Sequence, residues 1–143
     1  MEVPEPQLTA WRSLLDAQAA VIASAERALA EAGLPPLSWY DVLWELFRAP
    51  DRKLRMHELA ERVTISRSGL VRFVDRLERA GAVTRETCAT DRRGAYAVLT
   101  DAGAELLRKM WPVYARTLND SFASRLDDAE ATRVAEALSR VAR

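Results

Sequence analysis

The stretch of sequence that decides the fold is residues 66–81, SRSGLVRFVDRLERAG. Its apolar residues recur every three or four positions, which predicts an amphipathic helix over 67–80 with one face to bury. These apolar residues are Leu70, Phe73, Val74 and Leu77. Ser66 is a good N-cap for this helix, and Gly81 is a typical stop signal after it. The other face of the helix is left to polar and basic side chains.

That polar face has the features that a DNA-reading helix needs. A helix start presents free N–H groups and the positive end of the helix dipole, which favour a phosphate group. Small side chains at this start let the backbone come close to another molecule, and the major groove of B-DNA, about 12 Å wide, admits one α-helix. We therefore take six residues as candidate DNA-binding residues, namely Ser66, Arg67, Ser68, Gly69, Arg72 and Arg76. An ordinary solvated helix face with Glu–Arg pairs is the alternative.

The segment after this helix predicts a β-hairpin with a basic tip. Residues 83–88 and 95–99 are rich in β-prone side chains and flank a polar turn. The turn contains Arg92 and Arg93, and an extended Arg at such a tip can enter a narrow minor groove, where negative potential is concentrated. Asp91 is expected to pair with one of the two and leave the other for DNA. Helix and hairpin together favour DNA binding over a merely solvated surface.

Charge is distributed unevenly along the 143 residues, although the formal net charge is zero. Residues 1–50 carry three Arg against seven acidic residues, a net charge of −4. Residues 51–101 carry eleven basic against eight acidic residues, a net +3, and residues 102–143 carry seven against six, a net +1. Positions 62–93 hold eight Arg and no Lys. Because Arg binds phosphate oxygens and guanine edges in a fork, this cluster favours a nucleic-acid partner.

The sequence before this cluster predicts three helices. The first is amphipathic and covers about residues 7–33. Ser38 is expected to cap the second, with Asp41 three residues later in the manner of a capping box, and Pro50 is expected to end it. A basic link and a short helix follow, at residues 52–55 and 57–63.

The sequence after the hairpin predicts two further helices. Thr100 is expected to cap a long helix over about 102–119, with a kink or break at Trp111-Pro112. Asp127 and Glu130 form a second box-like cap, and the last helix follows. Its apolar face contains Val134, Leu138 and Val141.

Four motifs in this order resemble the MarR family, the multiple-antibiotic-resistance-type winged helix-turn-helix regulators. They are ELAERV at 58–63, the helix stretch at 66–81, DRRG at 91–94 and VLTDAG at 98–103. The resemblance covers nearly the whole chain. It implies a mostly α fold with a small β-hairpin wing (α+β), in which the turn between the strands is the wing and residues 67–80 form the reading helix.

The same resemblance implies an arrangement of the chain and its partners. One domain over 1–143 is expected to hold a winged helix-turn-helix DNA-binding lobe over 37–101 and helical dimerisation regions at 7–33 and 102–143. The implied protein is an obligate homodimer that binds a pseudo-palindromic operator in double-stranded DNA, by default as a repressor. A second copy also buries the apolar faces of the terminal helices, which are short of partners in one chain.

A small effector is also implied by the resemblance, because members commonly release DNA when a small, often aromatic, molecule binds where the dimer helices meet the DNA lobe. Aromatic side chains line many ligand pockets. The candidate ligand-binding residues are Trp11, Trp39, Tyr40, Trp44 and Trp111. A place in the core is the alternative for each of them.

Other classes of protein find less support in the sequence. An enzyme is not expected, because His57 has no catalytic partner in a recognisable motif and there is no Gly-rich cofactor loop. One His and one Cys, Cys88, make a structural metal site unexpected, so we expect no cofactor and treat Cys88 as structural or incidental. No apolar stretch approaches the roughly 20 residues of a membrane span, so a cytoplasmic protein without a membrane partner is expected. A module that binds protein through its winged helix is the remaining alternative.

Overall fold

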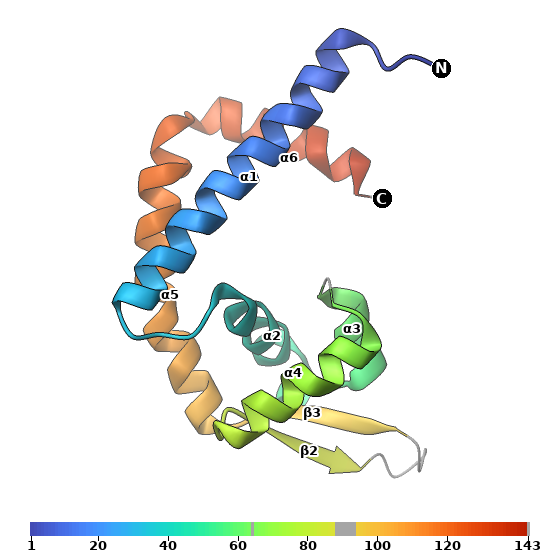
Figure 1. Cartoon of the computed structure of the whole chain (residues 1–143), viewed down its shortest axis with the longest axis vertical. Coiled ribbons are helices and arrows are strands. Elements are labelled where there is room, and N and C mark those ends of the chain that lie inside the picture. Colours follow the sequence, from blue (N-terminus) through green and yellow to red (C-terminus); the bar gives the residue numbers. More distant parts are fainter. Residues whose placement is uncertain (64, 88–93, 143) are drawn as a thin grey trace. The chain divides into compact units, whose positions relative to one another are not determined.

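The computed structural model describes residues 1–63, 65–87 and 94–142 (Figure 1). The described part is mostly helical, with a small antiparallel sheet, so the predicted fold class is confirmed. The α-helices are α1 (Glu5–Glu31), α2 (Leu37–Arg48), α3 (Met56–Arg62), α4 (Arg67–Arg79), α5 (Asp101–Ser121) and α6 (Asp128–Val141). The strands are β1 (Lys53–Arg55), β2 (Val83–Thr87) and β3 (Ala95–Leu99), and two short 3-10 helices are η1 (Pro50–Arg52) and η2 (Ala123–Arg125).

The chain divides into two compact units. One unit contains residues 1–33 and 112–143, and the other contains residues 34–111. Helix α5 belongs to both, and it continues through Pro112 without the break that the sequence suggested. The division therefore falls inside α5, about ten residues later in the chain than the expected end of the DNA-binding lobe at 101.

The unit of residues 34–111 contains a three-stranded antiparallel sheet in the order β1-β3-β2. Strands β2 and β3 form the predicted hairpin, with Val83 opposite Leu99 and Thr87 opposite Ala95. Strand β1 lies where the sequence predicts a basic link. Its three residues, with only the central Leu54 buried, are too few to show an alternating pattern.

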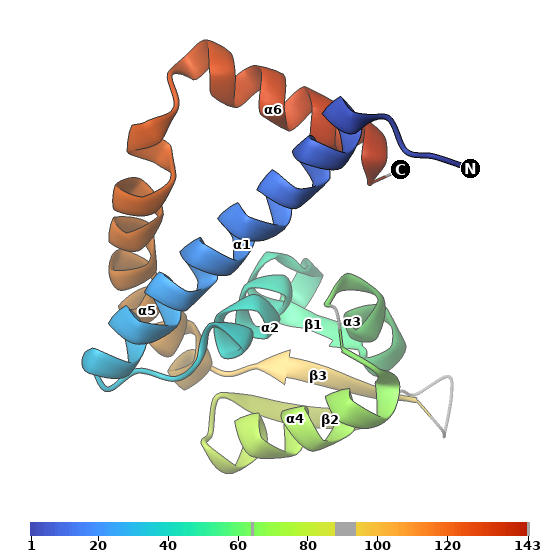
Figure 2. The same cartoon turned by 45° about the horizontal axis from the view of Figure 1, so that its top comes forward.

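The core of this unit lies between the helices and the sheet. The predicted apolar stripe of α4 is buried, with Leu70 1%, Phe73 6%, Val74 0% and Leu77 0% exposed. Helix α4 contacts α3 and β2, and α2 contacts β3 (Figure 2). Further fully buried side chains come from α2, α3 and the sheet, namely Val42, Leu43, Leu46, Leu59, Val83 and Ala97. The polar face of α4 is therefore directed away from this core.

Three of the four predicted helix caps are confirmed. The Ser66 hydroxyl accepts a hydrogen bond from the Gly69 N–H at 3.2 Å, and the Thr100 hydroxyl accepts one from the Gly103 N–H at 3.0 Å. A reciprocal capping box joins the side chains and backbones of Asp127 and Glu130.

The predicted cap at Ser38 is wrong. Helix α2 begins at Leu37, with Pro36 at the N-cap and no side-chain cap bond, so Ser38 lies inside the helix. Pro36 has φ −57° and ψ 156°, with φ in the range that its ring imposes, and this extended residue leads directly into the helix. The earlier start also buries Leu37, which is 7% exposed.

Candidate nucleic-acid interface

Helices α3 and α4 form a helix-turn-helix pair. Helix α3 ends at Arg62, where the Val63 N–H donates to the Leu59 carbonyl at 3.1 Å. The Ile65 N–H then donates to the Val63 carbonyl at 2.9 Å, and α4 begins directly after Ser66. This short connection and the contact between the two helices hold the start of α4 at the surface of the unit.

The start of α4 brings together the predicted small and polar residues. Ser66 and Ser68 are exposed, and their hydroxyl oxygens lie 3.4 Å apart. A Cβ atom at Gly69 would lie 3.0 Å from the Ser66 Oγ and 3.3 Å from the Ile65 Cγ2. Glycine at this position therefore leaves room for the capping hydroxyl. Arg67 occupies the first position of the helix.

The basic side chains of α4 that were predicted to bind DNA are available at its surface. Arg72 and Arg76 are both exposed, and the guanidinium of Arg76 lies 5.2 Å from the centre of the Phe73 ring. Within the part of the chain that the structure describes, neither Arg72 nor Arg76 forms an ion pair. These two guanidinium groups can therefore meet an external anion or a base edge without first breaking a salt bridge of the described chain.

The tip of the predicted wing lies outside the described residues. Arg92 and Arg93, the candidate DNA-binding residues of the hairpin, are in this stretch together with Asp91 and Cys88. Their proposed roles stay predictions.

One residue near the candidate interface is not predicted from the sequence. Arg85 of β2 reaches across to α4, where its Nη2 atom lies 2.6 Å from the Asp75 Oδ1 and donates to the Val71 carbonyl at 3.1 Å. The alternation of side chains along β2 is the one sequence signal for this contact, since Arg85 shares a strand face with the buried Val83. Arg85 therefore links the hairpin to one turn of the candidate reading helix.

Other basic residues of this unit are engaged in contacts within the chain. Glu45 of α2 pairs with Arg48 at 3.3 Å and with Arg62 at 3.6 Å. On the sheet, the Lys53 Nζ lies 3.7 Å from the Glu86 Oε1 and 4.9 Å from the centre of the Tyr96 ring. These contacts distinguish the basic residues around α2 and β1 from those on the exposed face of α4.

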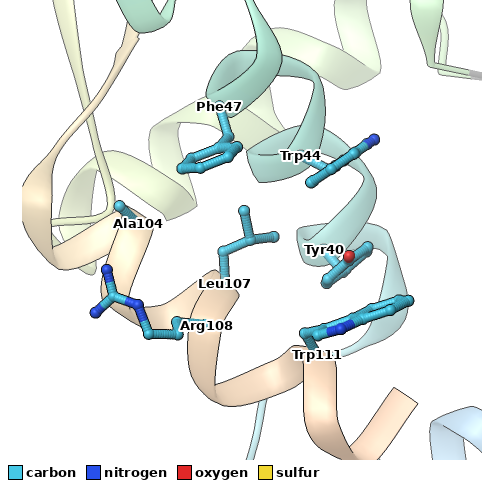
Figure 3. A pocket seen from close by; sticks show the side chains of 7 residues that line it. All are labelled: Tyr40, Trp44, Phe47, Ala104, Leu107, Arg108 and Trp111. Atoms are coloured by element: carbon cyan, nitrogen blue, oxygen red, sulfur yellow. The ribbon is translucent and has the colours of Figure 1, made fainter. Parts of the chain in front are cut away.

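An aromatic pocket lies between α2 and the first half of α5 in the same unit (Figure 3). Its volume is about 590 Å³, and its lining residues are Tyr40, Trp44, Phe47, Ala104, Leu107, Arg108 and Trp111. The ring centres of Tyr40 and Trp111 lie 6.1 Å apart, and those of Tyr40 and Trp44 lie 6.4 Å apart, with nearly parallel planes in each case. Stacked rings thus form a continuous apolar wall.

The pocket contains some of the predicted ligand-binding residues and not others. Tyr40, Trp44 and Trp111 line it, but Trp39 does not, because its ring packs edge-on against Phe73 of α4 at 6.5 Å. Trp11 lies in the unit of residues 1–33 and 112–143 and is 54% exposed. Four lining residues were not foreseen, namely Phe47, Ala104, Leu107 and Arg108. The sequence gives no local signal for them, because α5 meets α2 only in the folded unit.

In the described part of the chain, no three His, Cys, Asp or Glu side chains come together as a metal site. None of the described helices combines the length and apolar character that a membrane span requires.

The helix-turn-helix of α3 and α4, followed by the β-hairpin and completed by β1, defines a winged helix-turn-helix protein. A family model described as the MarR family matches residues 32–94. The crystal structure of AbsC, a MarR family transcriptional regulator from Streptomyces coelicolor, is 31% identical, with a TM-score of 0.88 over 99% of this chain and 95% of that chain. Sco3205, a MarR family transcriptional regulator from the same organism, in complex with DNA, is 34% identical, with a TM-score of 0.89 over 99% of this chain and 89% of that chain. The chain belongs to the MarR family of transcriptional regulators.

A curated relative agrees over a shorter stretch. The HTH-type transcriptional regulator YkoM from Bacillus subtilis is 30% identical over 76 residues, which cover 53% of this chain and 49% of that protein. The match therefore spans about half the length of that relative. The family resemblance inferred from the sequence motifs is confirmed, and it places the chain among DNA-binding transcription factors rather than enzymes.

Proposed function

We propose that this protein represses transcription by binding a pseudo-palindromic DNA operator as a homodimer, with α4 in the major groove. The observation that carries the proposal is the two-sided character of α4. One side is buried, and the other presents Arg72 and Arg76 without ion pairs to the described residues. The solved complex of Sco3205 with DNA supports a DNA partner for this chain. Such a regulator acts in the cytoplasm.

The residues of the interface have different roles in this proposal. Ser66, Ser68 and the free backbone N–H groups at the start of α4 bind phosphate, because the helix N-terminus favours an anion. Arg72 reads a base edge, since the forked guanidinium can donate two hydrogen bonds to guanine. Beyond these residues, Arg67 and Arg76 bind phosphate from the helix, and Arg92 and Arg93 reach the minor groove from the wing.

The dimer is proposed from apolar residues that remain exposed in the unit of residues 1–33 and 112–143. Helix α1 exposes Trp11, Leu15 and Ile22, and α6 exposes Val134, Leu138 and Val141. Burial of such faces against a second copy removes their apolar surface from water. A two-fold dimer then presents two DNA-binding lobes to two half-sites about 34 Å apart, one helical turn of B-DNA.

The aromatic pocket is proposed as the site of a small aromatic effector. A planar ligand can stack against Tyr40, Trp44 and Trp111, whose rings already form one wall. Arg108 lines the same pocket and pairs with Glu105, so an acidic substituent on the ligand is proposed to compete with Glu105 for its guanidinium. Helix α2, which holds half of this pocket, also contacts α3 and β3 of the DNA-binding lobe. Binding of the effector is proposed to release the operator.

A comparison of Arg72→Ala with the unchanged protein tests the DNA-reading role. We expect the variant to lose about 1 to 3 kcal/mol of binding free energy for the operator and much less for unrelated duplex DNA, measured by fluorescence anisotropy. Arg125→Ala is the matched control, because Arg125 is also exposed but lies in η2. An equal loss on all duplexes would make Arg72 a phosphate contact. If Arg72→Ala leaves specific binding unchanged, the result would argue that α4 lies outside the DNA interface.

A protein-binding module is the second candidate function. The dependence of binding on salt concentration distinguishes it from a DNA-binding regulator. Contacts with phosphate release counterions, so DNA binding must weaken as the salt concentration rises. Binding of this protein to duplex DNA that does not depend on salt would favour the protein-binding module.

A further inference from the structure

Helix α4 exposes one large apolar side chain among those that the structure describes. This residue is Val71, with 46% of its surface exposed, whereas its neighbour Leu70 is 1% exposed. Val71 is therefore not part of the core of its unit. An exposed β-branched residue also adds little to the stability of a helix, because branching restricts its side chain.

The structure holds Val71 in a fixed position. Its carbonyl oxygen accepts a hydrogen bond from the Arg85 Nη2 at 3.1 Å, and the same nitrogen lies 2.6 Å from the Asp75 Oδ1 one helical turn later. Arg85 thus anchors the turn of α4 that carries Val71 to the hairpin. Because valine in a helix strongly prefers one χ1 rotamer, its two methyl groups project in a defined direction.

Val71 borders the surface that contains the candidate DNA-reading residues. It lies three positions after Ser68 on the helix, so these two side chains are neighbours on the same face, and Arg72 follows directly. Asp75 would repel DNA from this flank, but its carboxylate is paired with Arg85. When α4 lies in the major groove, it therefore presents an apolar group, the side chain of Val71, beside hydrogen-bonding groups.

The major groove offers one apolar group to such a side chain, the C5-methyl group of thymine. We propose that Val71 is a specificity-determining residue that contacts the C5-methyl group of one thymine in each half-site of the operator. This inference rests on the proposed function, and it names a base that the arginine contacts alone do not select.

Replacement of single thymines by deoxyuridine tests this contact, because it removes the methyl group and keeps the hydrogen-bonding edge of the base. The probe is the inverted repeat that the unchanged protein selects from random duplexes, with one thymine replaced at a time. We expect replacement at one thymine of each half-site to weaken binding about fourfold, the effect of one buried methyl group. Val71→Ala should bind the thymine and deoxyuridine duplexes equally well. Val71→Thr, which keeps one of the two methyl groups, should retain part of the effect.

The matched control is Val3→Ala, which makes the same change at an exposed valine ahead of α1. It should behave as the unchanged protein on every duplex. The inference is overturned, with the proposed function intact, if the protein binds its operator but deoxyuridine has no effect at any position. It is also overturned if Val71→Ala keeps the full sensitivity to deoxyuridine. If no duplex is selected at all, the proposed function and this inference fail together.

Discussion

Among single residues, Arg85 links β2 to α4 through its contacts with Asp75 and the Val71 carbonyl. Its side chain is 32% exposed and that of Asp75 is 39% exposed, so water weakens the attraction between them. Exposed ion pairs of this kind contribute about 0.2 to 1 kcal/mol to stability. We therefore propose that the pair matters for the position of α4, the candidate reading helix, and we expect its loss to affect DNA binding more than folding.

A double-mutant cycle measures this positioning role. Arg85→Ala and Asp75→Ala should each weaken operator binding while the free energy of unfolding changes by less than about 1 kcal/mol. Because the two residues act through one contact, the double variant should lose no more affinity than the worse single variant. Anisotropy titrations and urea denaturation give the two quantities. Additive losses of affinity would show that each residue acts independently.

At the scale of elements, the start of α4 combines a structural and a functional requirement. The Ser66 hydroxyl satisfies the Gly69 N–H, and substitution of such a cap by alanine costs about 1 kcal/mol. The same hydroxyl lies at the end of the helix that we propose to face phosphate. Substitutions that keep the cap but change the charge can therefore separate the two requirements.

Ser66→Asp is the substitution that separates them. Aspartate is as good an N-cap as serine, so the midpoint of thermal unfolding should stay close to that of the unchanged protein. DNA binding should fall strongly at low salt, because the new carboxylate faces phosphate, whereas Ser66→Ala should lower the unfolding midpoint as well. Undiminished DNA binding by a stable Ser66→Asp variant would place the start of α4 away from the phosphates.

Features that depend on residues close together in the sequence were predicted correctly. The stripe of α4, the hairpin and the caps at Ser66, Thr100 and Asp127 depend on neighbours in sequence, and all of them are present. The cap at Ser38 failed because Pro36 starts α2 earlier. Strand β1 is too short to show a pattern, and alternation along β2 places Arg85 on the face of Val83 without identifying its partners on α4, which are distant in sequence. The pocket was predicted only in part for the same reason.

For the whole molecule, the proposed function requires two copies of the chain. Leu138 on α6 is 37% exposed and Val134 is 38% exposed, and we propose that a second copy covers them. Leu138→Glu should therefore shift the protein toward monomers in sedimentation velocity, because it places a charge in an apolar interface. Specific DNA binding should weaken in parallel, since one lobe contacts one half-site.

Ser139→Glu is the matched control for this change, because Ser139 is the exposed neighbour of Leu138 and lies on a different face of α6. It adds the same charge and should leave the dimer in place. A Leu138→Glu variant that sediments as the unchanged protein does would exclude this part of α6 from the dimer interface.

The most direct test of the central claim is selection of bound duplexes from a random pool, repeated at two salt concentrations. We expect an enriched inverted repeat with half-sites about one helical turn apart, bound more weakly at the higher salt concentration. Failure to enrich any sequence at either salt concentration would contradict the assignment of α4 as a reading helix.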